Sequence, residues 1–386
     1  MSQLVDNSWV ETDSAALASN VALFKQRLAP GSRLGVVVKS NAYGHGAALA
    51  SRAFVDAGAD WLIVNDVVEA LALRDAGLEA PIYICGPVPP AAAPQVVAAR
   101  ARTVVYDGAF VTALDAAGRA AGWVVPLHIK IETGNTRQGI DAHEALALAE
   151  RIASLPGVRL EGLATHYADI EDTTDHTFAQ SQLRTFLEVR DAFIAAGYPV
   201  EMSHSANSAA AILWPKTHGE MVRVGIAAYG LWPSRETYVT ALQAHARRED
   251  GLLPELAPAL SWRARVAQVK SVPSGAFVGY GRTYRATHDC QIAVLPMGYH
   301  EGYDRRLSNL GHVLIRGVRA PIRGRVCMNM TMVDVTHVPE VQAGDVATLL
   351  GRDGDEQITA EQLAEWMGTI NYEVVARIHP ALPRRT

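Results

Sequence analysis

The segment Val37–Gly46 holds the residues of this sequence that are best suited to covalent chemistry. It reads VVKSNAYGHG, so an apolar run delivers Lys39 at its end, and Gly44 and Gly46 follow closely. A lysine amine must lose its proton before it attacks an aldehyde, and partial desolvation lowers its pKa by disfavouring the charged form. The pattern therefore indicates a Schiff-base lysine at Lys39. A lysine that is merely solvated or ion-paired is the alternative.

Two other segments could bind a phosphate. Ser208 and the run Arg223–Ile226 follow the last two apolar runs described below, where barrel enzymes often hold a phosphate with hydroxyl and backbone N–H groups. Tyr43 could donate a phenol hydrogen bond to the same group. Ser208 could equally cap a helix that starts before Ala209, and this role is compatible with phosphate binding.

Short β-branched apolar runs alternate with alanine-rich stretches of helical period in the first part of the chain, as in strand–helix repeats around a parallel sheet. The eight predicted strands are Gly35–Lys39, Trp61–Asn65, Pro81–Cys85, Thr103–Tyr106, Leu127–Ile131, Leu160–His166, Glu201–His204 and Met221–Ile226. Predicted helices include Leu49–Ala57, Val67–Ala76, Ala142–Ala153 and Thr177–Ala196.

Eight such units over about 200 residues favour a (β/α)8, TIM-like barrel, with a doubly wound open sheet as the alternative. Unusual polar residues at or just beyond the strand ends favour the closed barrel, in which these ends carry the chemistry. These residues are Lys39, Lys130, His166, His204, Asn207, Ser208 and Arg223.

A second, mostly β domain is predicted after a polar connection at about residues 240–256, because the later segments are short and lack a helical period. Its predicted strands are Val266–Ser271, Gln291–Leu295, His312–Ile315, Val326–Val335 and Asp345–Leu350. One short helix is predicted at Thr359–Met367, with the Thr359 hydroxyl as its cap.

Composition restricts the partners. The chain has 35 Lys and Arg against 40 Asp and Glu, and its net charge of −5 gives no general attraction to nucleic acid or anionic membranes. Three cysteines and scattered histidines without paired ligand spacing predict neither disulfides nor a metal. No signal-peptide pattern and no apolar run of about 18 residues is evident, so we expect a cytoplasmic protein that acts on a small molecule.

The motif Val38–Gly46 resembles the pyridoxal phosphate (PLP) attachment motif of the alanine racemase family, with Ser40 where alanine is usual. Further segments are similar to motifs of this family in the same order and extend the resemblance over nearly the whole chain. They are Thr165–Asp169, His204–Ser208, Val222–Gly230, Gly279–Gly281, Gly298–Tyr299, Gly324–Met328 and Ile370–Glu373.

The resemblance implies a PLP-dependent amino-acid racemase, an isomerase, with alanine as the expected substrate. It implies a PLP-binding barrel at residues 13–240 and a β-rich domain at 241–386, against which residues 1–12 would pack. It also implies a head-to-tail homodimer whose active sites combine both subunits. Whether such an enzyme serves cell-wall D-alanine supply or alanine breakdown stays open at this level.

The resemblance also assigns the cofactor site. The phosphate would be held by Tyr43, Ser208, Gly225, Ile226 and Tyr372. His166 and Asn207 would complete the cofactor-binding set. Arg223 would face the pyridine nitrogen, and because a guanidinium does not give up its proton, that nitrogen should remain unprotonated. Less delocalisation of charge into the ring would then discourage transamination.

Racemisation needs a proton removed from one face of Cα and returned on the other, so two bases on opposite sides are the simplest apparatus. Lys39 would be one base. The resemblance makes Tyr280 of the partner subunit the other, with a pKa lowered through His166 and nearby positive charge. It places Arg137 and the backbone N–H of Met328 at the substrate carboxylate.

Lys130 and His204 would support the site. The resemblance implies a CO₂-modified Lys130 whose negative charge orients Arg137, and a plain lysine paired with Glu132 is the alternative.

Three departures from the family pattern could alter the substrate range: Asn135 and Gln138 stand where Met and Leu are common, and Asn329 where Asp is usual. Amides add hydrogen-bonding groups, so a broader-specificity racemase that accepts serine is one alternative. A non-catalytic PLP carrier is another. The signature motifs of a PLP decarboxylase are not evident in this sequence. A Rossmann dehydrogenase requires a GxGxxG motif after its first strand, and no such motif is present there.

Overall fold

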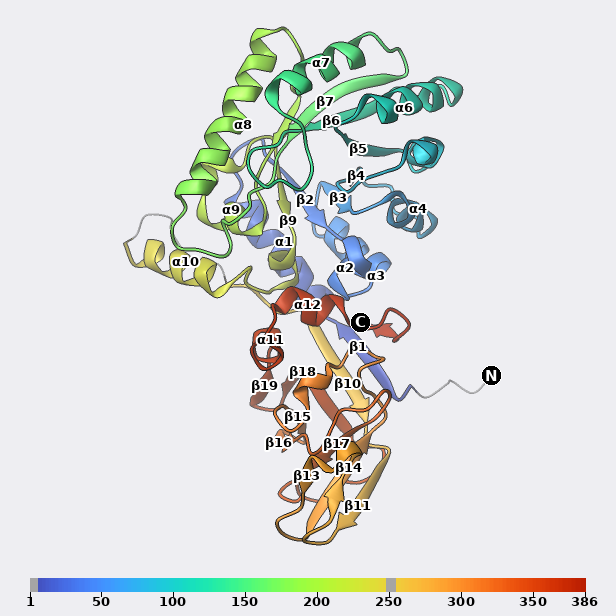
Figure 1. Ribbon diagram of the computed structural model, residues 1–386, viewed down its shortest axis with the longest axis vertical. Helices are drawn as coiled ribbons and strands as arrows, with labels where there is room; N and C mark the ends of the chain where they lie inside the picture. The colour runs from blue at the N-terminus through green and yellow to red at the C-terminus, as the bar shows by residue number, and fades with distance from the viewer. Residues whose placement is uncertain (1–5, 248–254) are drawn as a thin grey trace. The chain divides into compact units, whose positions relative to one another are not determined.

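The computed structural model describes residues 6–247 and 255–386 (Figure 1). Their contacts form two compact units. The larger unit comprises residues Ala15–Ala42 and Ala47–Pro258. The smaller unit comprises the N-terminal residues up to Ser14, the short segment Tyr43–Gly46, and Ala259–Thr386.

The larger unit is built on eight parallel strands in the order β8-β7-β6-β5-β4-β3-β2-β9. They are β2 (Arg33–Val37), β3 (Trp61–Val64), β4 (Ile82–Ile84), β5 (Ala101–Val105), β6 (Val125–Lys130), β7 (Val158–Ala164), β8 (Met202–His204) and β9 (Met221–Val224). The ends of this sheet approach each other, since Glu220 N donates to Ser203 O (3.2 Å) and Arg223 N to Ala206 O (3.1 Å). The predicted barrel is confirmed, nearly closed, and the open sheet is excluded.

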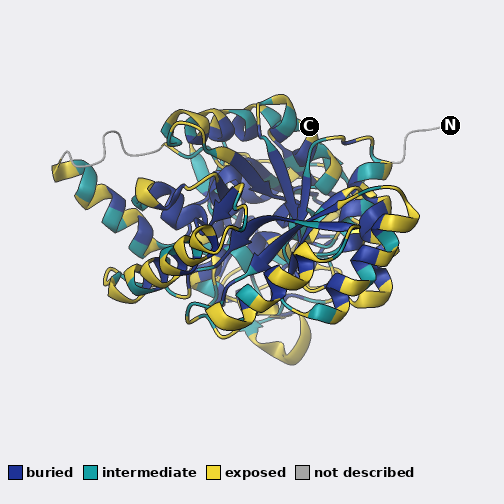
Figure 2. Cartoon of the chain, turned by 90° about the horizontal axis from the view of Figure 1, so that it is seen from above, coloured by how far each residue is buried: buried dark blue, intermediate teal, exposed yellow. Residues whose placement is uncertain are grey.

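Helices cover the outside of this barrel, with their outer faces exposed and the strands buried (Figure 2). They are α1 (Ser14–Arg27), α3 (Ala47–Asp56), α4 (Val67–Asp75), α5 (Ala93–Ala98), α6 (Gly108–Ala120), α7 (Ala142–Ala153), α8 (Thr177–Ala195), α9 (Ser208–Leu213) and α10 (Arg235–Arg247), with short 3-10 turns at Pro90–Ala92, Pro215–Thr217 and Ile226–Tyr229. Aspartates at 66, 107 and 141 cap α4, α6 and α7 by accepting backbone N–H bonds. Helix α10 takes up the start of the connection expected at 240–256, and residues 248–254 lie outside the described residues.

The smaller unit is mostly β, as predicted, with two short helices and two 3-10 turns. Its largest sheet has the order β16-β15-β18-β10-β1-β20, with β19 paired to β18, and smaller sheets are β11-β14-β17 and β12-β13. The elements are β1 (Ser8–Thr12), β10 (Leu260–Arg265), β11 (Gln268–Val272), β12 (Phe277–Val278), η4 (Tyr280–Arg282), β13 (Tyr284–Arg285), β14 (Cys290–Leu295), η5 (Arg305–Leu307), β15 (His312–Ile315), β16 (Val318–Pro321), β17 (Thr331–Asp334), β18 (Val346–Asp353), β19 (Glu356–Ile358), α11 (Ala360–Met367), α12 (Asn371–Ala376) and β20 (Arg384–Arg385).

The predicted cap of the short helix α11 is confirmed, because the Thr359 side chain accepts a hydrogen bond from Gln362 N at its start. Within the described ranges, no helix has both the length and the apolar character that crossing a bilayer requires.

Candidate active site

Lys39 opens a left-handed turn that directly follows β2. The turn α2 (Lys39–Tyr43) contains Ser40, Asn41, Ala42 and Tyr43 with φ angles of +54°, +56°, +52° and +50°. Such a conformation costs roughly 1–2 kcal/mol for each non-glycine residue and persists only where the surroundings enforce it. The apolar run before Lys39 gave no indication of this turn.

Hydrogen bonds enforce the turn from both sides. Asn41 Oδ1 accepts from Ala47 N (2.8 Å), and Glu69 receives Ser40 N (2.5 Å) on one oxygen and Asn65 N (2.7 Å) on the other. The Lys39 side chain itself is half-buried, and its amine has no hydrogen bond or ion pair with any residue in the described ranges. The turn therefore fixes the backbone at Lys39 while leaving the amine available for covalent chemistry.

Arg223 lies in the barrel interior near the end of β9, with 7% of its surface exposed. Its Nη1 donates to His204 Nδ1 (2.6 Å) and His204 O (2.8 Å), and its Nη2 donates to Thr165 O (2.8 Å). Within the described residues no carboxylate lies within ion-pair distance of it. A buried guanidinium held only by neutral acceptors is costly, so a functional role explains it better than a structural one.

Positive charge gathers around Arg223. Burial lowers the pKa of His166 well below its usual value, and the charges of Lys130, Arg223, Arg137 and Lys39 lower it further. All four predicted cations thus act on one imidazole, and the structure brings together these members of the predicted site. Arg137 is exposed, whereas His204 is fully buried.

Lys130 ends β6, and its amine has no hydrogen-bond partner among the described residues. Burial, followed by the charge of Arg223, lowers the pKa of its amine to about 7. It makes no ion pair among the described residues, so the pairing with Glu132 is not observed. Instead Glu132 accepts the backbone N–H groups of Gly134 (2.5 Å) and Asn135 (2.7 Å) and closes the loop after β6.

The buried imidazoles lead to an expected loss of stability in acid. Burial lowers the pKa values of His128, His166, His204 and His218 in the folded chain, while an unfolded histidine titrates near 6.5. As pH falls through 6.5 the unfolded state takes up more protons than the folded state, so the free energy of unfolding should fall by up to about 1.4 kcal/mol per pH unit for each group. Urea midpoints at pH 8, about 6.5 and about 5.5 test this.

The exposed His143 provides the control for this experiment. His143→Asn should leave the acid dependence unchanged, because His143 lies exposed at the surface and is not one of the buried imidazoles. Urea midpoints that stay constant between pH 8 and about 5.5 would contradict the expectation.

The Ser208 hydroxyl connects the start of α9 to the turn that follows β9. Ser208 Oγ accepts the backbone N–H of Gly225 (2.9 Å) and, more distantly, that of Ala227 (3.5 Å). The expectation that Ser208 caps α9 is wrong, because Asn207 is the cap and its Oδ1 accepts Ala210 N (3.0 Å). Ser208 is therefore free of the capping role, and its hydroxyl and the turn that contains Ile226 converge on one point.

The three departures from the family pattern differ in their surroundings. Asn135 Nδ2 donates to Tyr167 O (3.3 Å), and Asn329 Nδ2 donates to Glu301 Oε1 (2.7 Å), so both amides are engaged. Gln138 Nε2 is buried and has no partner in the described part of the chain. It lines a small cavity together with Lys130, Arg137 and His166. Only Gln138 therefore adds an unused donor to the barrel mouth.

The smaller unit contributes two pairs of predicted site residues. The rings of Tyr43 and Tyr372 lie 6.0 Å apart, so two of the expected phosphate ligands are neighbours. Tyr280 is 73% exposed and Met328 55% exposed, and both line a hollow of about 720 Å³. Tyr299 and Met330, which are also exposed, line the same hollow.

Sequence reasoning missed several residues that hold the site. Glu69 fixes the turn after Lys39, Thr165 O accepts from Arg223, and His128 contacts His204 inside the barrel. His128 interrupts a predicted apolar strand, as Glu161 does in the next one. Polar residues within otherwise apolar strands were the sequence feature that could have identified these positions.

The fold and these side chains define a class of enzyme. It is a parallel barrel that carries, at the carboxyl ends of its strands, a lysine amine without a partner among the described residues and several cations around His166, of which Arg223 is buried. Two family models match the chain, the alanine racemase N-terminal domain over residues 12–233 and the alanine racemase C-terminal domain over residues 259–386. The chain belongs to the alanine racemase family.

Individual relatives agree with this assignment. The alanine racemase of Leptospira interrogans is 36% identical over 98% of this chain and 95% of its own length. The crystal structure of alanine racemase from Bacillus anthracis with bound L-Ala-P has a TM-score of 0.89 and 34% identity, covering 99% of this chain and 95% of that one. The crystal structure of alanine racemase from Bartonella henselae with covalently bound pyridoxal phosphate has a TM-score of 0.82 and 25% identity, covering 98% of this chain and 99% of that one.

Proposed function

We propose that this chain interconverts L- and D-alanine with PLP as its cofactor and Lys39 as the residue that binds the cofactor aldehyde. The observation that carries the proposal is the half-buried amine of Lys39, which has no partner among the described residues and is held by an enforced turn near the buried Arg223 and the other cations around His166. The family membership and the relative from Bartonella henselae with covalently bound pyridoxal phosphate support it. We also propose a cytoplasmic location, with domains at residues 13–240 and 241–386.

The residues present fit PLP. The Ser208 oxygen accepts the Gly225 N–H, which leaves the Ser208 hydroxyl hydrogen to donate to the phosphate, and Gly225, Ile226, Asn207, Tyr43 and Tyr372 are the further proposed members of that set. Arg223, buried without a carboxylate, can donate to the ring nitrogen as it donates to other neutral acceptors. When bound, PLP withdraws electrons from the Cα–H bond of the amino acid and makes that proton removable.

The side chains of this protein would then move one proton. Lys39 accepts or returns the Cα proton on one face, and Tyr280 from the partner subunit does so on the other. Arg137 and the Met328 N–H bind the substrate carboxylate and orient Cα.

The exposure of Tyr280 supports a dimer with shared active sites. A phenol that is 73% exposed has neither the burial nor the partners that a catalytic base needs within its own unit. The hollow that it lines with Met328 offers apolar surface for a second copy of the chain. We propose a head-to-tail homodimer in which each copy completes the active site of the other.

Lys130 is proposed to carry a carbamate. A pKa of about 7 leaves much of its amine unprotonated at neutral pH, and a neutral amine can attack CO₂ to form a carbamate with release of one proton. The resulting anion would offset the nearby charges of Arg223 and Arg137 and supply an acceptor for the unpaired Gln138 Nε2.

The carbamate can be detected directly. Protein equilibrated with carbon-labelled bicarbonate is expected to show one carbamate resonance, which disappears in Lys130→Ala and weakens in Gln138→Leu. Lys25→Ala is the control, because Lys25 pairs with Asp60 (2.8 Å) at the surface. A Lys130 amine that stays unmodified under saturating bicarbonate would contradict the proposal.

The reaction itself tests the proposed function. PLP-loaded protein should form D-alanine from L-alanine and, in deuterium oxide, exchange the Cα hydrogen of both enantiomers. kcat/KM for alanine should exceed that for serine. The reverse order would favour a broader-specificity enzyme, in which the Gln138 amide, unpartnered among the described residues, could hydrogen-bond a polar substrate side chain. PLP binding without any exchange would identify a carrier.

A further inference from the structure

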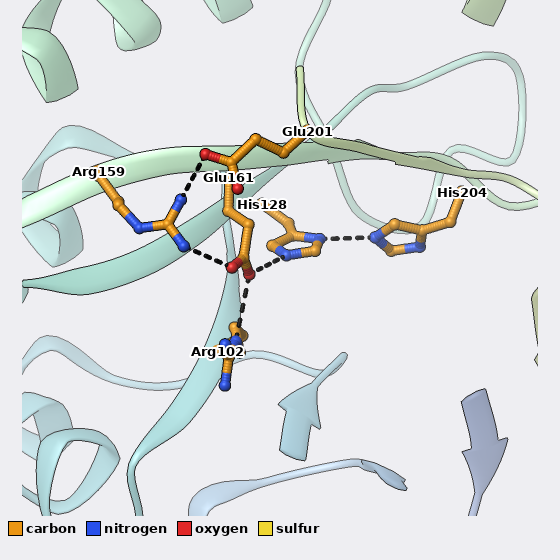
Figure 3. Close-up of polar contacts among 6 residues, drawn as sticks. All are labelled: Arg102, His128, Arg159, Glu161, Glu201 and His204. Carbon is orange, nitrogen blue, oxygen red and sulfur yellow. Dashed lines mark hydrogen bonds and ion pairs between the residues drawn. The ribbon is translucent and has the colours of Figure 1, made fainter. Parts of the chain in front are cut away.

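A line of buried polar side chains crosses the barrel interior and has no part in the proposed reaction (Figure 3). His204 on β8 and His128 on β6 are both fully buried, and Glu161 on β7 is 4% exposed. His204 Nε2 lies 2.7 Å from His128 Nδ1, and His128 Nε2 lies 2.9 Å from Glu161 Oε2. Since His204 Nδ1 also contacts Arg223, four groups form one continuous hydrogen-bonded relay.

The protonation of these groups gives the relay a single direction. Burial alone would raise the pKa of Glu161, but the hydrogen bond from His128 and the charges of Arg102 and Arg159 lower it to about 2, so this carboxylate only accepts. Burial lowers the pKa values of His128 and His204 and keeps both rings neutral. His128 must therefore donate from Nε2 and accept at Nδ1.

The same rule fixes the second ring. His204 donates from Nε2 to His128, so its Nδ1 is an acceptor. That acceptor is what Arg223 Nη1 requires at 2.6 Å. If His204 took the other tautomer, two N–H groups would face each other in the barrel interior, which is strongly unfavourable.

Packing holds both rings in place. The Tyr83 ring lies 4.9 Å from the His128 ring and 5.2 Å from the His204 ring, measured between centroids. Gly162 faces His128 across the strand pair, and a Cβ there would come within 2.2 Å of Met202 O and 3.1 Å of His128 Nδ1. The site is therefore built to admit the imidazole and to prevent its reorientation.

The relay also connects the buried guanidinium of Arg223, through two imidazoles, to the carboxylate of Glu161. Glu161 accepts from Arg159 Nη2 (2.7 Å) and Arg102 Nε (3.3 Å), and Arg159 Nη1 donates to Glu201 Oε1 (2.9 Å) (Figure 3). Arg102, Arg159 and Glu201 stand at the amino-terminal ends of their strands, opposite the end that carries Arg223. This end of a barrel usually serves stability alone.

We propose that His128 and Glu161 are positioning residues for Arg223: through His204 they fix the orientation and hydrogen-bond polarity of the guanidinium that meets the cofactor ring. The relay thus connects the far end of the barrel to the electronic environment of the ring nitrogen. This inference rests on the proposed function, in which Arg223 faces that nitrogen of PLP.

The test uses PLP labelled at its ring nitrogen and bound to the full-length protein. Glu161→Gln keeps the shape but removes the charge and adds a donor, so the tautomers of both imidazoles can reverse. We expect the ring-nitrogen chemical shift to change and the Kd for PLP to rise about tenfold. Glu201→Gln is the matched control. It makes the same Glu-to-Gln change at a residue that contacts Arg159 but not the imidazoles, so it should leave the ring-nitrogen chemical shift and the Kd for PLP unchanged.

A structural role alone would give another result. If Glu161→Gln lowers the melting temperature but leaves the chemical shift and the Kd at wild-type values, the proposal is wrong. His128→Leu and His128→Gln serve if Glu161→Gln does not fold: the leucine should reproduce the shift change, and the glutamine, which can accept and donate, should restore most of the wild-type shift. Equal shifts in both would overturn the proposal, whereas wild-type protein that binds no PLP would overturn the proposed function as well.

Discussion

Lys39→Ala is expected to yield a folded protein that has lost the visible absorbance of covalently held PLP and has lost racemisation by at least about 10³-fold. The substitution removes both the group that we propose to bind the cofactor aldehyde and one of the two proposed bases. It should cost little stability, since the Lys39 amine has no hydrogen bond or ion pair with the described residues. Absorbance spectra and initial rates of D-alanine formation measure the effect.

Lys25→Ala is a suitable control for this substitution. Lys25 is 37% exposed and pairs with Asp60 on the barrel surface, so its loss should change neither the spectrum nor the rate. A Lys39→Ala protein that keeps the absorbance band, or racemises at the wild-type rate, would show that another amine holds the cofactor.

Tyr280→Phe has the second largest expected effect. It removes one hydroxyl from an exposed ring, so folding and PLP absorbance should be unaffected, while racemisation falls by about 10²- to 10⁴-fold because one face of Cα loses its base. Cα hydrogen exchange in deuterium oxide should persist for one enantiomer, since Lys39 still serves its own face. Tyr238→Phe, on α10, is the control and should behave as wild type.

Mixed dimers of the two inactive variants test whether active sites are shared. In a Lys39→Ala/Tyr280→Phe heterodimer, one site lacks both bases and the other has both. Random re-association of equal amounts should therefore restore about one quarter of wild-type activity. If Tyr280 acted within its own chain, both sites would lack one base and no activity would return.

The strands of the barrel could be predicted from the sequence because each one buries a continuous apolar run. The residues at which the strands end were harder to predict, because hydrogen bonding to neighbouring strands determines where each strand stops. The run Leu160–His166, for example, stops as β7 at Ala164, after which Thr165 N donates to His204 O. Strands β1 and β10 were missed because they depend on each other: Trp9 pairs with Arg263, far along the chain, and no local pattern shows that partnership.

Some residues of the site could likewise be predicted from the sequence, and others could not. Lys39, Lys130, His166 and Arg223 were predictable because polar residues at the ends of parallel strands converge. The relay was not, because it depends on strand register. A shift between Leu127 and His128 brings that imidazole opposite Gly162, the position with room for it.

The short segment Tyr43–Gly46 limits how far this protein can be treated as modular. It follows Lys39, the proposed cofactor lysine, by a few residues, yet its own partners belong to the smaller unit: Gly44 O accepts Arg384 Nε (3.1 Å), and His45 O accepts the Thr12 hydroxyl (2.8 Å). A Cβ at Gly44 would meet Val375 O at 2.0 Å, so the segment fits those neighbours closely. In a barrel expressed without the C-terminal residues, the segment that follows Lys39 would therefore lose its partners. A design that moves the proposed chemistry of Lys39 into another scaffold would have to include these distant residues as well.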